Sequence, residues 1–290
     1  MTEQPKKMML VDGMALLFRA YFATSYSGYI MKTSKGVPTN AIHGFVKYFW
    51  DAVQTFQPSH VVCCWDMGAK TFRTEMYDQY KANREAPPED LIPQFDLVKK
   101  VVESFGVPNI GLVGYEADDC LGTLAEMYSK ELPVQILTGD HDTLQLVKEN
   151  IEVIIMKKGQ SNYAVYTPEI LVEEKGITPE QMVDLKALMG DSSDNYPGVK
   201  GIGEKTALKL LQEYQHIEGI LENLASLSAG VRKKIEAELD MLHLSRQLAR
   251  IRCDVPVQFS IEETVWNINP ERVLKQFDEL EFKGLKKLIG

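Results

Sequence analysis

Apolar and polar residues follow one another along the chain in a pattern typical of buried strands separated by helices. Short apolar runs rich in β-branched residues occur at Met8–Val11, His60–Trp65, Ile110–Val113, Val134–Leu137 and Ile151–Met156. Segments with helical periodicity lie between several of these runs. Strands that alternate with helices predict an α/β fold whose sheet is largely parallel. In such a sheet, ligands bind at the carboxyl ends of the strands.

Helical signals dominate the second half of the chain. Apolar residues at i, i+3, i+4 and i+7 predict an amphipathic helix there at Ala207, Leu210, Leu211 and Tyr214, as they do earlier in the chain at Leu121, Leu124, Ala125 and Tyr128. Thr178 stands three residues before Gln181, the pattern of a capped helix start, and we expect this helix to run to about Met189. Strand signals become scarce after about residue 170. We therefore predict an α/β domain over residues 1–172 and a helical domain over 173–290.

The composition is that of a globular protein without a disulfide framework. Of the 290 residues, 44% are hydrophobic and 25% are charged, which is ordinary for such proteins. The four cysteines form no CxxC pair, which indicates reduced thiols and a cytoplasmic location. No apolar run approaches the roughly 18 residues that a membrane helix needs. The net charge of −9 by itself argues against a nucleic-acid partner.

Acidic side chains stand where the predicted strands end. Seven of them follow four successive strands, and two more lie three residues apart in a GDSSDN segment. The nine residues are Asp12, Asp66, Glu116, Asp118, Asp119, Asp140, Asp142, Asp191 and Asp194. If the strands are parallel, these carboxylates converge on one edge of the sheet. Two carboxylates about 4 Å apart repel each other by about 4 kcal/mol at an effective dielectric constant near 20, so such a cluster needs cations.

Hard oxygen ligands favour Mg²⁺ or Mn²⁺, and the number of acids indicates two ions. Two ions about 3.5–4 Å apart suit in-line displacement at phosphorus. The alternative is that each aspartate is a turn former or helix N-cap, with Asp119 favouring the N-terminus of its helix. If all nine acids bind metal, the remaining surface is neutral overall and can be locally basic. The net charge then no longer excludes a nucleic-acid substrate.

A glycine-containing turn, NYPGVKGIGEKTA, spans residues 195–207 and leads into an amphipathic helix. Backbone N–H groups and the helix dipole at such a turn can bind a phosphate. The glycine spacing fits neither a P-loop nor a dinucleotide-binding fingerprint. We expect a helix-hairpin-helix unit that holds a DNA backbone; the alternative is a plain turn between helices. Its candidate residues are Lys200, Gly201, Gly203, Lys205 and Thr206.

A second candidate surface combines cations and aromatic rings. At about 100° per residue, six residues fall within one arc of a helix: Lys70, Arg73, Tyr77, Tyr80, Lys81 and Arg84. If the segment is one unbroken helix, it presents charges and rings together, as a single-strand groove does. The alternative is an ordinary solvated helix face.

Five segments in order carry a resemblance to a known family. They read LVDGMALLFRAYFA, TFRTEMYDQYKANR, GYEADDCLGTLA, TGDHDTLQLV and GDSSDNYPGVKGIGEKTA, from about residue 8 to about residue 250. They resemble the motifs of the bacterial 5′→3′ exonuclease family, which includes the N-terminal nuclease domain of DNA polymerase I and is related to flap endonucleases. Because nothing similar to a polymerase domain follows, we expect a stand-alone member.

The resemblance implies a PIN-like α/β core with a helical arch at about residues 67–105, and a DNA-binding domain with a helix–three-turn–helix motif. It implies divalent-metal-dependent hydrolysis of DNA at 5′ ends, flaps and nicks, by a two-metal mechanism. The first metal would be held by Asp12, Asp66, Glu116 and Asp118. The second would be held by Asp140, Asp142, Asp191 and Asp194, with Asp119 beside or between the two sites.

The same resemblance gives roles to four further positions. Lys81 and Arg84 match cations that contact the scissile phosphate, and Tyr80 matches a ring that stacks near the scissile nucleotide. Arg19 resembles a phosphate-contacting residue. A potassium ion at 201–206 is implied as well. His141, between two matched acids, is expected to be a neutral loop residue.

Two other functions remain open. A DNA-junction binder with little catalysis would gain nothing from nine acids that face a polyanion. A PIN-type ribonuclease, or a nuclease of RNA–DNA hybrids, fits a duplex-DNA hairpin less well, but the acids do not reveal a sugar preference. We expect a nucleoid-associated monomer. Beyond about residue 253 we identify no chemistry, only a packing helix that starts at Asn269-Pro270-Glu271.

Overall fold

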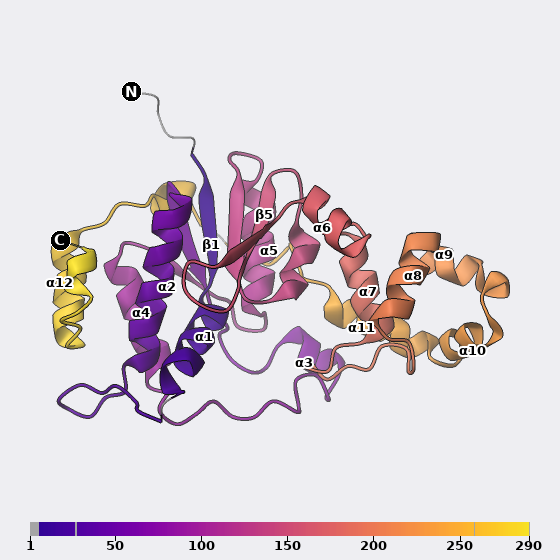
Figure 1. Cartoon of the computed structure of the whole chain (residues 1–290), viewed down its shortest axis with the longest axis horizontal. Helices are drawn as coiled ribbons and strands as arrows, with labels where there is room; N and C mark the ends of the chain where they lie inside the picture. The colour runs from indigo at the N-terminus through magenta and orange to yellow at the C-terminus, as the bar shows by residue number, and fades with distance from the viewer. Residues whose placement is uncertain (1–5, 27, 258, 290) are drawn as a thin grey trace.

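The computed structural model describes residues 6–26, 28–257 and 259–289, which form a central sheet with helices on both faces (Figure 1). The strands are β1 (Met8–Asp12), β2 (His60–Cys64), β3 (Asn109–Ile110), β4 (Val134–Thr138), β5 (Ile151–Met156) and β6 (Tyr163–Tyr166). The sheet order is β3-β2-β1-β4-β5-β6, and every neighbouring pair is parallel except β5 and β6. The prediction of an α/β fold with a largely parallel sheet is confirmed.

Helices connect and follow these strands. In the first half they are α1 (Gly13–Ser25), α2 (Asn40–Phe56), α3 (Phe72–Met76), α4 (Gln94–Ser104), α5 (Ala117–Tyr128) and α6 (Pro168–Lys175). In the second half they are α7 (Gln181–Met189), α8 (Glu204–Tyr214), α9 (Ile217–Glu222), α10 (Ala229–Ala237), α11 (Leu239–Ala249) and α12 (Pro270–Glu279). Across the part of the chain that the structure describes, no helix is both long and apolar enough to cross a membrane.

Successive strand residues point to opposite faces of the sheet, and both faces are buried. Leu10 and Ile136 pack on one side with α5, whereas Met9, Val11 and Leu137 pack on the other with α1, α2 and α4. Burial on both faces explains why the strands read as continuous apolar runs rather than as alternating patterns.

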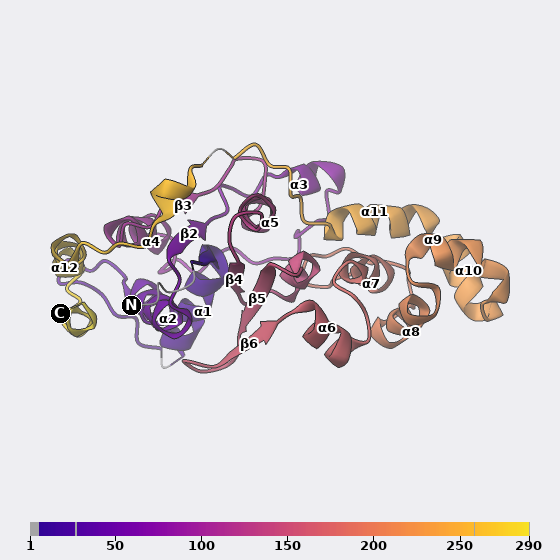
Figure 2. The ribbon, with the colours of Figure 1, turned by 90° about the horizontal axis from the view of Figure 1, so that it is seen from above.

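The helical second half forms one end of an elongated molecule, and α12 lies at the other end beside α4 (Figure 2). Leu188 of α7 and Leu211 of α8 belong to the same hydrophobic cluster as Ile136 of β4. The expected boundary at residue 172 therefore does not mark a break in the core.

The C-terminal residues return to the sheet. The side chain of Asn269 accepts a hydrogen bond from the N–H of Arg272 (3.2 Å) and caps α12. Val273 and Phe277 of α12 are fully buried in the cluster that includes α2 and α4. The predicted packing helix exists, but it packs on the α/β half, which corrects its placement in a helical domain over 173–290.

Two strand predictions differ from the structure. The run Ile110–Val113 contributes only β3, because the chain turns away after Ile110. A Cβ atom at Gly111 would lie 2.5 Å from the carbonyl oxygen of Trp65, so the backbone makes a close approach there. The antiparallel β6 was missed, since four residues at a sheet edge carry too weak a pattern.

The segment of residues 67–105 is not one helix. α3 ends at Met76, Tyr77 is extended (φ −148°, ψ 107°), and turns follow until α4 begins at Gln94. Lys81 adopts a left-handed conformation (φ 55°), which no helix allows. The predicted arc of six residues is therefore wrong as a helix face, and the expected helical arch consists of two short helices with turns between them. Contacts of Tyr80, Lys81 and Arg84 with distant carboxylates replace helical hydrogen bonding here.

Replacing Phe277 with alanine tests the role of the returning helix. Its ring is fully buried and lies 6.0 Å from the ring centroids of both Phe105 and Phe282. We expect Phe277→Ala to lower the free energy of unfolding by about 3–5 kcal/mol in denaturant titrations. Phe22→Ala, at a ring that is 60% exposed, should change it by less than about 1 kcal/mol. Equal effects of the two variants would contradict the assignment of α12 to the core.

Candidate metal centre and nucleic-acid interface

Five carboxylates meet in one cavity at the carboxyl edge of the sheet. The cavity has a volume of about 170 Å³. Its polar lining consists of Asp12, Asp66, Glu116, Asp118 and Asp140, together with Lys81 and Arg84. These acids end β1, follow β2 and β4, and begin α5, so the neighbouring parallel strands bring them together as the sequence argument expected.

Two of these acids also cap helices. Asp12 Oδ1 accepts a hydrogen bond from the N–H of Ala15 (2.9 Å), and Asp12 Oδ2 accepts one from the hydroxyl of Thr138 (2.7 Å). Asp66 Oδ1 accepts one from the N–H of Ala117 at the start of α5 (2.7 Å). Capping and cavity lining are therefore compatible, because the helix starts lie at the same edge as the strand ends.

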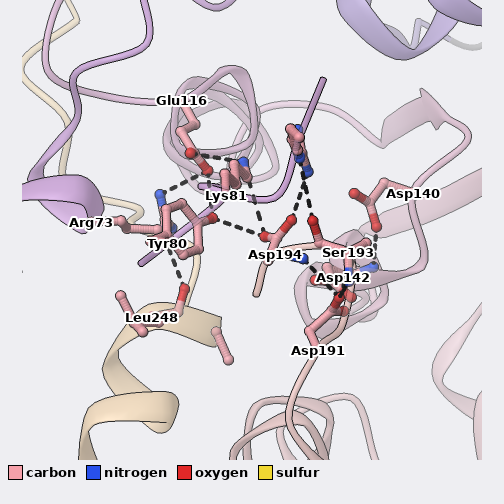
Figure 3. Close-up of polar contacts among 12 residues, drawn as sticks. Arg73, Tyr80, Lys81, Glu116, Asp140, Asp142, Asp191, Ser193, Asp194 and Leu248 are labelled. Atoms are coloured by element: carbon pink, nitrogen blue, oxygen red, sulfur yellow. Dashed lines mark hydrogen bonds and ion pairs between the residues drawn. The ribbon is translucent and has the colours of Figure 1, made fainter. Parts of the chain in front are cut away.

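A second group of acids lies beside the cavity and is held by basic and hydroxyl side chains (Figure 3). Tyr80 donates its hydroxyl hydrogen bond to Asp194 Oδ2 (2.9 Å) and to Glu116 Oε2 (3.1 Å). Lys81 Nζ lies 2.8 Å from Glu116 Oε1, and an Arg84 nitrogen lies 2.6 Å from Asp194 Oδ1. Asp194 thereby joins the turn after α7 to the first cavity.

Lys186 of α7 links the remaining two acids. Its Nζ lies 2.5 Å from Asp142 Oδ1 and 2.5 Å from Asp191 Oδ2. Although burial alone would lower the pKa of Lys186, the two carboxylates outweigh it and raise that pKa. Sequence reasoning missed Lys186; the only signal was its place one helical turn before the GDSSDN segment.

The first cavity carries more negative charge than its cations neutralise. Burial raises the pKa of Asp12 to about 6, with the charges of Asp66 and Asp140 adding to the shift against two opposing hydrogen bonds. Burial and the nearby charge of Asp12 raise the pKa of Asp118 well above its usual range. Burial and Asp140 likewise raise the pKa of Asp142 to about 6. An ionised cluster of this kind is stabilised by added cations.

By contrast, Asp191 is well compensated. Burial alone would raise its pKa, but hydrogen bonds from Lys186 and Ser193 prevail and lower the pKa to about 2. Asp191 therefore stays ionised and keeps Lys186 in place.

The donor set fits hard divalent cations, although no ready-made site is present. Within residues 6–26, 28–257 and 259–289, no three His, Cys, Asp or Glu side chains are grouped closely enough to hold an ion. The reason lies in the ion pairs above, since Lys81, Arg84 and Lys186 take up carboxylate oxygens. The half-buried Asp66 and Asp118 and the exposed Asp140 keep oxygens available at the cavity. Carboxylate oxygens alone, without thiol or imidazole, are the ligands of Mg²⁺ and Mn²⁺.

Asp119 does not share this cavity. It is fully buried, and its two oxygens accept hydrogen bonds from Arg73 (both 2.8 Å) and from the N–H groups of Glu116 (3.0 Å) and Arg252 (2.8 Å). These hydrogen bonds make Asp119 a structural anchor of the α5 start, and metal binding by Asp119 stays a prediction.

Arg73 also departs from its expected place. It is 2% exposed, and besides Asp119 it donates to the carbonyl oxygens of Leu248 (2.9 Å) and Arg250 (2.7 Å). Its guanidinium is therefore inside the protein rather than on a DNA-facing stripe. Of its expected neighbours, Lys70 is exposed and pairs with Glu75 (3.2 Å), and Tyr77 is half-buried.

Two further candidates lie outside the cavity lining. Arg19 donates to the carbonyl oxygens of Met156 (3.1 Å) and Gly159 (3.2 Å) after β5, so this guanidinium is already engaged. His141 is exposed; partial burial and the charge of Lys175 lower its pKa, which agrees with a neutral loop residue.

The glycine turn forms a close hairpin between α7 and α8. Gly198 has a φ of 60°, and a Cβ atom there would lie 2.3 Å from the nitrogen of Gly190, so only glycine fits. Lys200 and Lys205 are exposed on this hairpin. The carbonyl oxygen of Gly201 accepts a hydrogen bond from Lys234 Nζ of α10 (2.8 Å). The hairpin is thus closely packed and cationic, as expected of a turn that binds the phosphate backbone of DNA.

Comparison with known proteins agrees with this architecture. Residues 7–176 match the model of the 5′-3′ exonuclease N-terminal resolvase-like domain, and residues 177–272 match that of the 5′-3′ exonuclease C-terminal SAM fold. The chain is 50% identical to a 5′-3′ exonuclease of Bacillus subtilis, with 98% of this chain and 96% of that protein aligned. The chain belongs to the 5′-3′ exonuclease family, which confirms the resemblance seen in its motifs.

More distant relatives extend the comparison. The chain is 42% identical to DNA polymerase I of Lactococcus lactis over 99% of its own length, but it spans only 33% of that polymerase. Among solved structures, the bacteriophage T5 D15 flap endonuclease, in a pseudo-enzyme-product complex with DNA and metal ions, superposes with a TM-score of 0.69. That match covers 98% of both chains at 20% identity, and it supports the fold.

The pKa shifts at the cavity predict how the cation-free protein responds to pH. A raised carboxyl pKa means that the native state binds protons more tightly than the unfolded state between about pH 4 and pH 6. In EDTA, the free energy of unfolding should therefore rise by about 1–3 kcal/mol as pH falls from about 8 to about 5. Asp118→Asn should raise stability at about pH 8 and weaken this dependence, because it removes one charge from the cluster.

The exposed Asp240 offers a matched control, since Asp240→Asn makes the same chemical change outside the cavity. Denaturant titrations at both pH values measure the effect. A loss of stability in Asp118→Asn at about pH 8, relative to this control, would show that the cavity carries no excess of negative charge.

Proposed function

We propose that this chain is a divalent-metal-dependent 5′→3′ nuclease that hydrolyses DNA phosphodiester bonds at 5′ ends, flaps and nicks. The observation that carries the proposal is the single cavity in which five carboxylates face Lys81 and Arg84. A cavity with that lining suits a phosphodiester bridged by cations, because acids alone would repel it. We place the catalytic half in residues 1–172 and the DNA-binding half in 173–290, with α12 of the latter stretch packing back on the catalytic half.

Two cations, Mg²⁺ or Mn²⁺, would supply the charge that activates a water and stabilises the leaving oxygen. Asp12, Asp66, Glu116 and Asp118 would hold the first cation. Asp140, Asp142, Asp191 and Asp194 would hold the second. The second set includes the partners of Lys186, so this ammonium would have to move when that cation binds.

The chain's own cations act on the substrate. Lys81, with its left-handed backbone, and Arg84 both line the cavity and pair with Glu116 and Asp194. Once their carboxylate partners bind cations, both side chains are free to neutralise charge on the scissile phosphate. Tyr80, 4% exposed and bonded to two carboxylates, holds the segment in position rather than offering its ring face.

The hairpin would hold the duplex. Lys200 and Lys205 provide charge, and backbone N–H groups at the α8 start provide donors for phosphate oxygens. A potassium ion at the hairpin would compete with Lys234 for the carbonyl oxygen of Gly201. The enzyme would act as a monomer on DNA.

Hydrolysis by the cavity is tested with Asp118→Ala. We expect cleavage of 5′-flap and nicked DNA in Mg²⁺, none in EDTA, and at least a roughly 100-fold loss of rate in the variant, or about 2.7 kcal/mol of barrier. Glu271→Ala, at an exposed acid in the first turn of α12, should retain full activity. Near-normal turnover by Asp118→Ala would contradict the metal assignment. Faster cleavage of RNA–DNA hybrids than of DNA would favour the ribonuclease alternative.

Duplex binding by the hairpin is tested separately. Replacing Lys200 and Lys205 together with alanine should weaken binding of duplex DNA in EDTA. It should also reduce the slope of log affinity against log salt by about one unit per lost phosphate contact. The same double change at the exposed Lys275 and Lys283, near α12, should leave the slope unchanged. An unaltered slope in the hairpin variant would exclude direct phosphate contacts by these lysines.

A further inference from the structure

A second cavity lies between α3 and α11, which run beside each other in both overall views (Figures 1 and 2). It has a volume of about 390 Å³. Arginines and apolar side chains line it, including Arg246, Arg250, Arg252, Phe72 and Met76, and no carboxylate is among its described lining residues. Two segments more than 160 positions apart in sequence thus line one cavity, with arginines from one segment and apolar side chains from the other.

The cationic side comes from one face of α11. His243, Arg246 and Gln247 lie on this face at i, i+3 and i+4, and Arg250, the extended residue that follows the helix (φ −75°, ψ 123°), lines the cavity with them. The opposite face of the helix carries Leu242 and Leu248, which are buried. Because packing uses that apolar face against α7, the polar face remains turned outward.

The three arginines differ in whether their guanidinium groups already have ion-pair partners within the protein. Arg246 pairs with Asp184 (2.7 Å) and also with Glu218, and Arg252 pairs with Asp254 (2.7 Å). Arg250 is exposed, and its guanidinium has no hydrogen-bond or ion-pair partner anywhere in the described part of the chain. Among the described residues of the cavity, the Arg250 guanidinium is therefore without a partner, whereas ion pairs hold those of Arg246 and Arg252 in place.

The apolar side comes from α3. Met76 is 40% exposed, and the ring of Phe72 has the guanidinium carbons of Arg73 and Arg252 at 4.5 Å and 5.5 Å from its centroid. A flexible thioether and an aromatic ring next to arginine suit a planar, polarisable group such as a nucleobase. A phosphate near Arg250 and a base near Met76 together describe one nucleotide unit.

Arg73 lines neither cavity, but it contacts residues that line each of them. On one side it binds Asp119 and lies 3.3 Å from Glu116 Oε2, and on the other it donates to the carbonyl oxygens of Leu248 and Arg250 (Figure 3 shows the contacts with Glu116 and Leu248). Residues that line the two cavities, Glu116 and Arg250, therefore lie within reach of one arginine side chain.

We propose that the α3–α11 cavity binds a nucleotide of the single-stranded 5′ segment of the substrate, with its phosphate on Arg250 and its base against Met76 and Phe72. The inference rests on the proposed nuclease function and adds a contact outside the carboxylate centre. It predicts that the cavity contributes to affinity only when a 5′ single strand is long enough to reach it.

The test compares Arg250→Ala with the wild type on nicked duplexes that carry no 5′ flap, a short flap or a long flap. Fluorescence anisotropy in EDTA measures binding without cleavage. We expect about a fivefold loss of affinity for the long flap, the size of one charge-assisted phosphate contact, and no loss without a flap. The salt slope for the long flap should fall by about 0.7, the value for one single-strand phosphate. The carbonyl of residue 250 still accepts from Arg73 in this variant, so the fold is retained.

Arg272→Ala on α12 is the matched control, since it removes an exposed arginine at the opposite end of the molecule. Equal losses with and without a flap would overturn the proposal, as would an Arg250→Ala variant that behaves like this control. Free deoxynucleoside 5′-monophosphate is added as a competitor; competition as strong as that of a single-stranded oligonucleotide would make the cavity a mononucleotide site and also overturn the proposal. If the wild type neither binds nor cleaves flapped DNA, the proposed function itself fails, which is a distinct result.

Discussion

Mutual repulsion of carboxylates at one edge of the sheet constrains most of this structure. Parallel strands end at the same edge of a sheet, and in this chain the ends of β1, β2 and β4 bring Asp12, Asp66 and Asp140 to that edge. Three basic side chains pair with acids of this cluster. Lys81 and Arg84 leave helical geometry to reach Glu116 and Asp194, and Lys186 bridges two acids from different segments. The irregular backbone of residues 77–84 brings these cations to the carboxylates.

The buried carboxylate of Asp119 is compensated differently, by the neighbouring guanidinium of Arg73. Here the charges are matched within the protein, with hydrogen bonds to main-chain groups completing both partners. Breaking such a pair leaves an uncompensated buried charge, which typically costs about 3–5 kcal/mol. The pair fixes α3 against α5 and the end of α11, so the framework around the cavity does not depend on bound cations. Acids that line the cavity and an acid that holds the framework thus stand next to each other in the same EADD segment.

Much of this arrangement could be predicted from the sequence, because periodicity and strand-end position are local signals. The sheet, its parallel pairing and the convergence of Asp12, Asp66 and Asp140 follow from them directly. Asp118 and Asp119, in contrast, are adjacent in sequence, and only packing reveals that one lines the cavity while the other is enclosed. The same holds for Arg73, whose place on a cationic stripe assumed a helix that tertiary contacts interrupt. Lys186 carried no local signal, since its two partners come from different parts of the chain.

The return of α12 to the sheet has a consequence for how the chain is made. Phe277 fills the outer layer over α2 and α4, although more than 150 residues separate it from the end of α4. During synthesis, the sheet and its first helices emerge from the ribosome long before this layer is available. Until then, the apolar surface around Phe49 and Phe105 stays open to solvent and to other nascent chains. We expect the growing polypeptide to depend on chaperone shielding of that surface until its last segment has been translated.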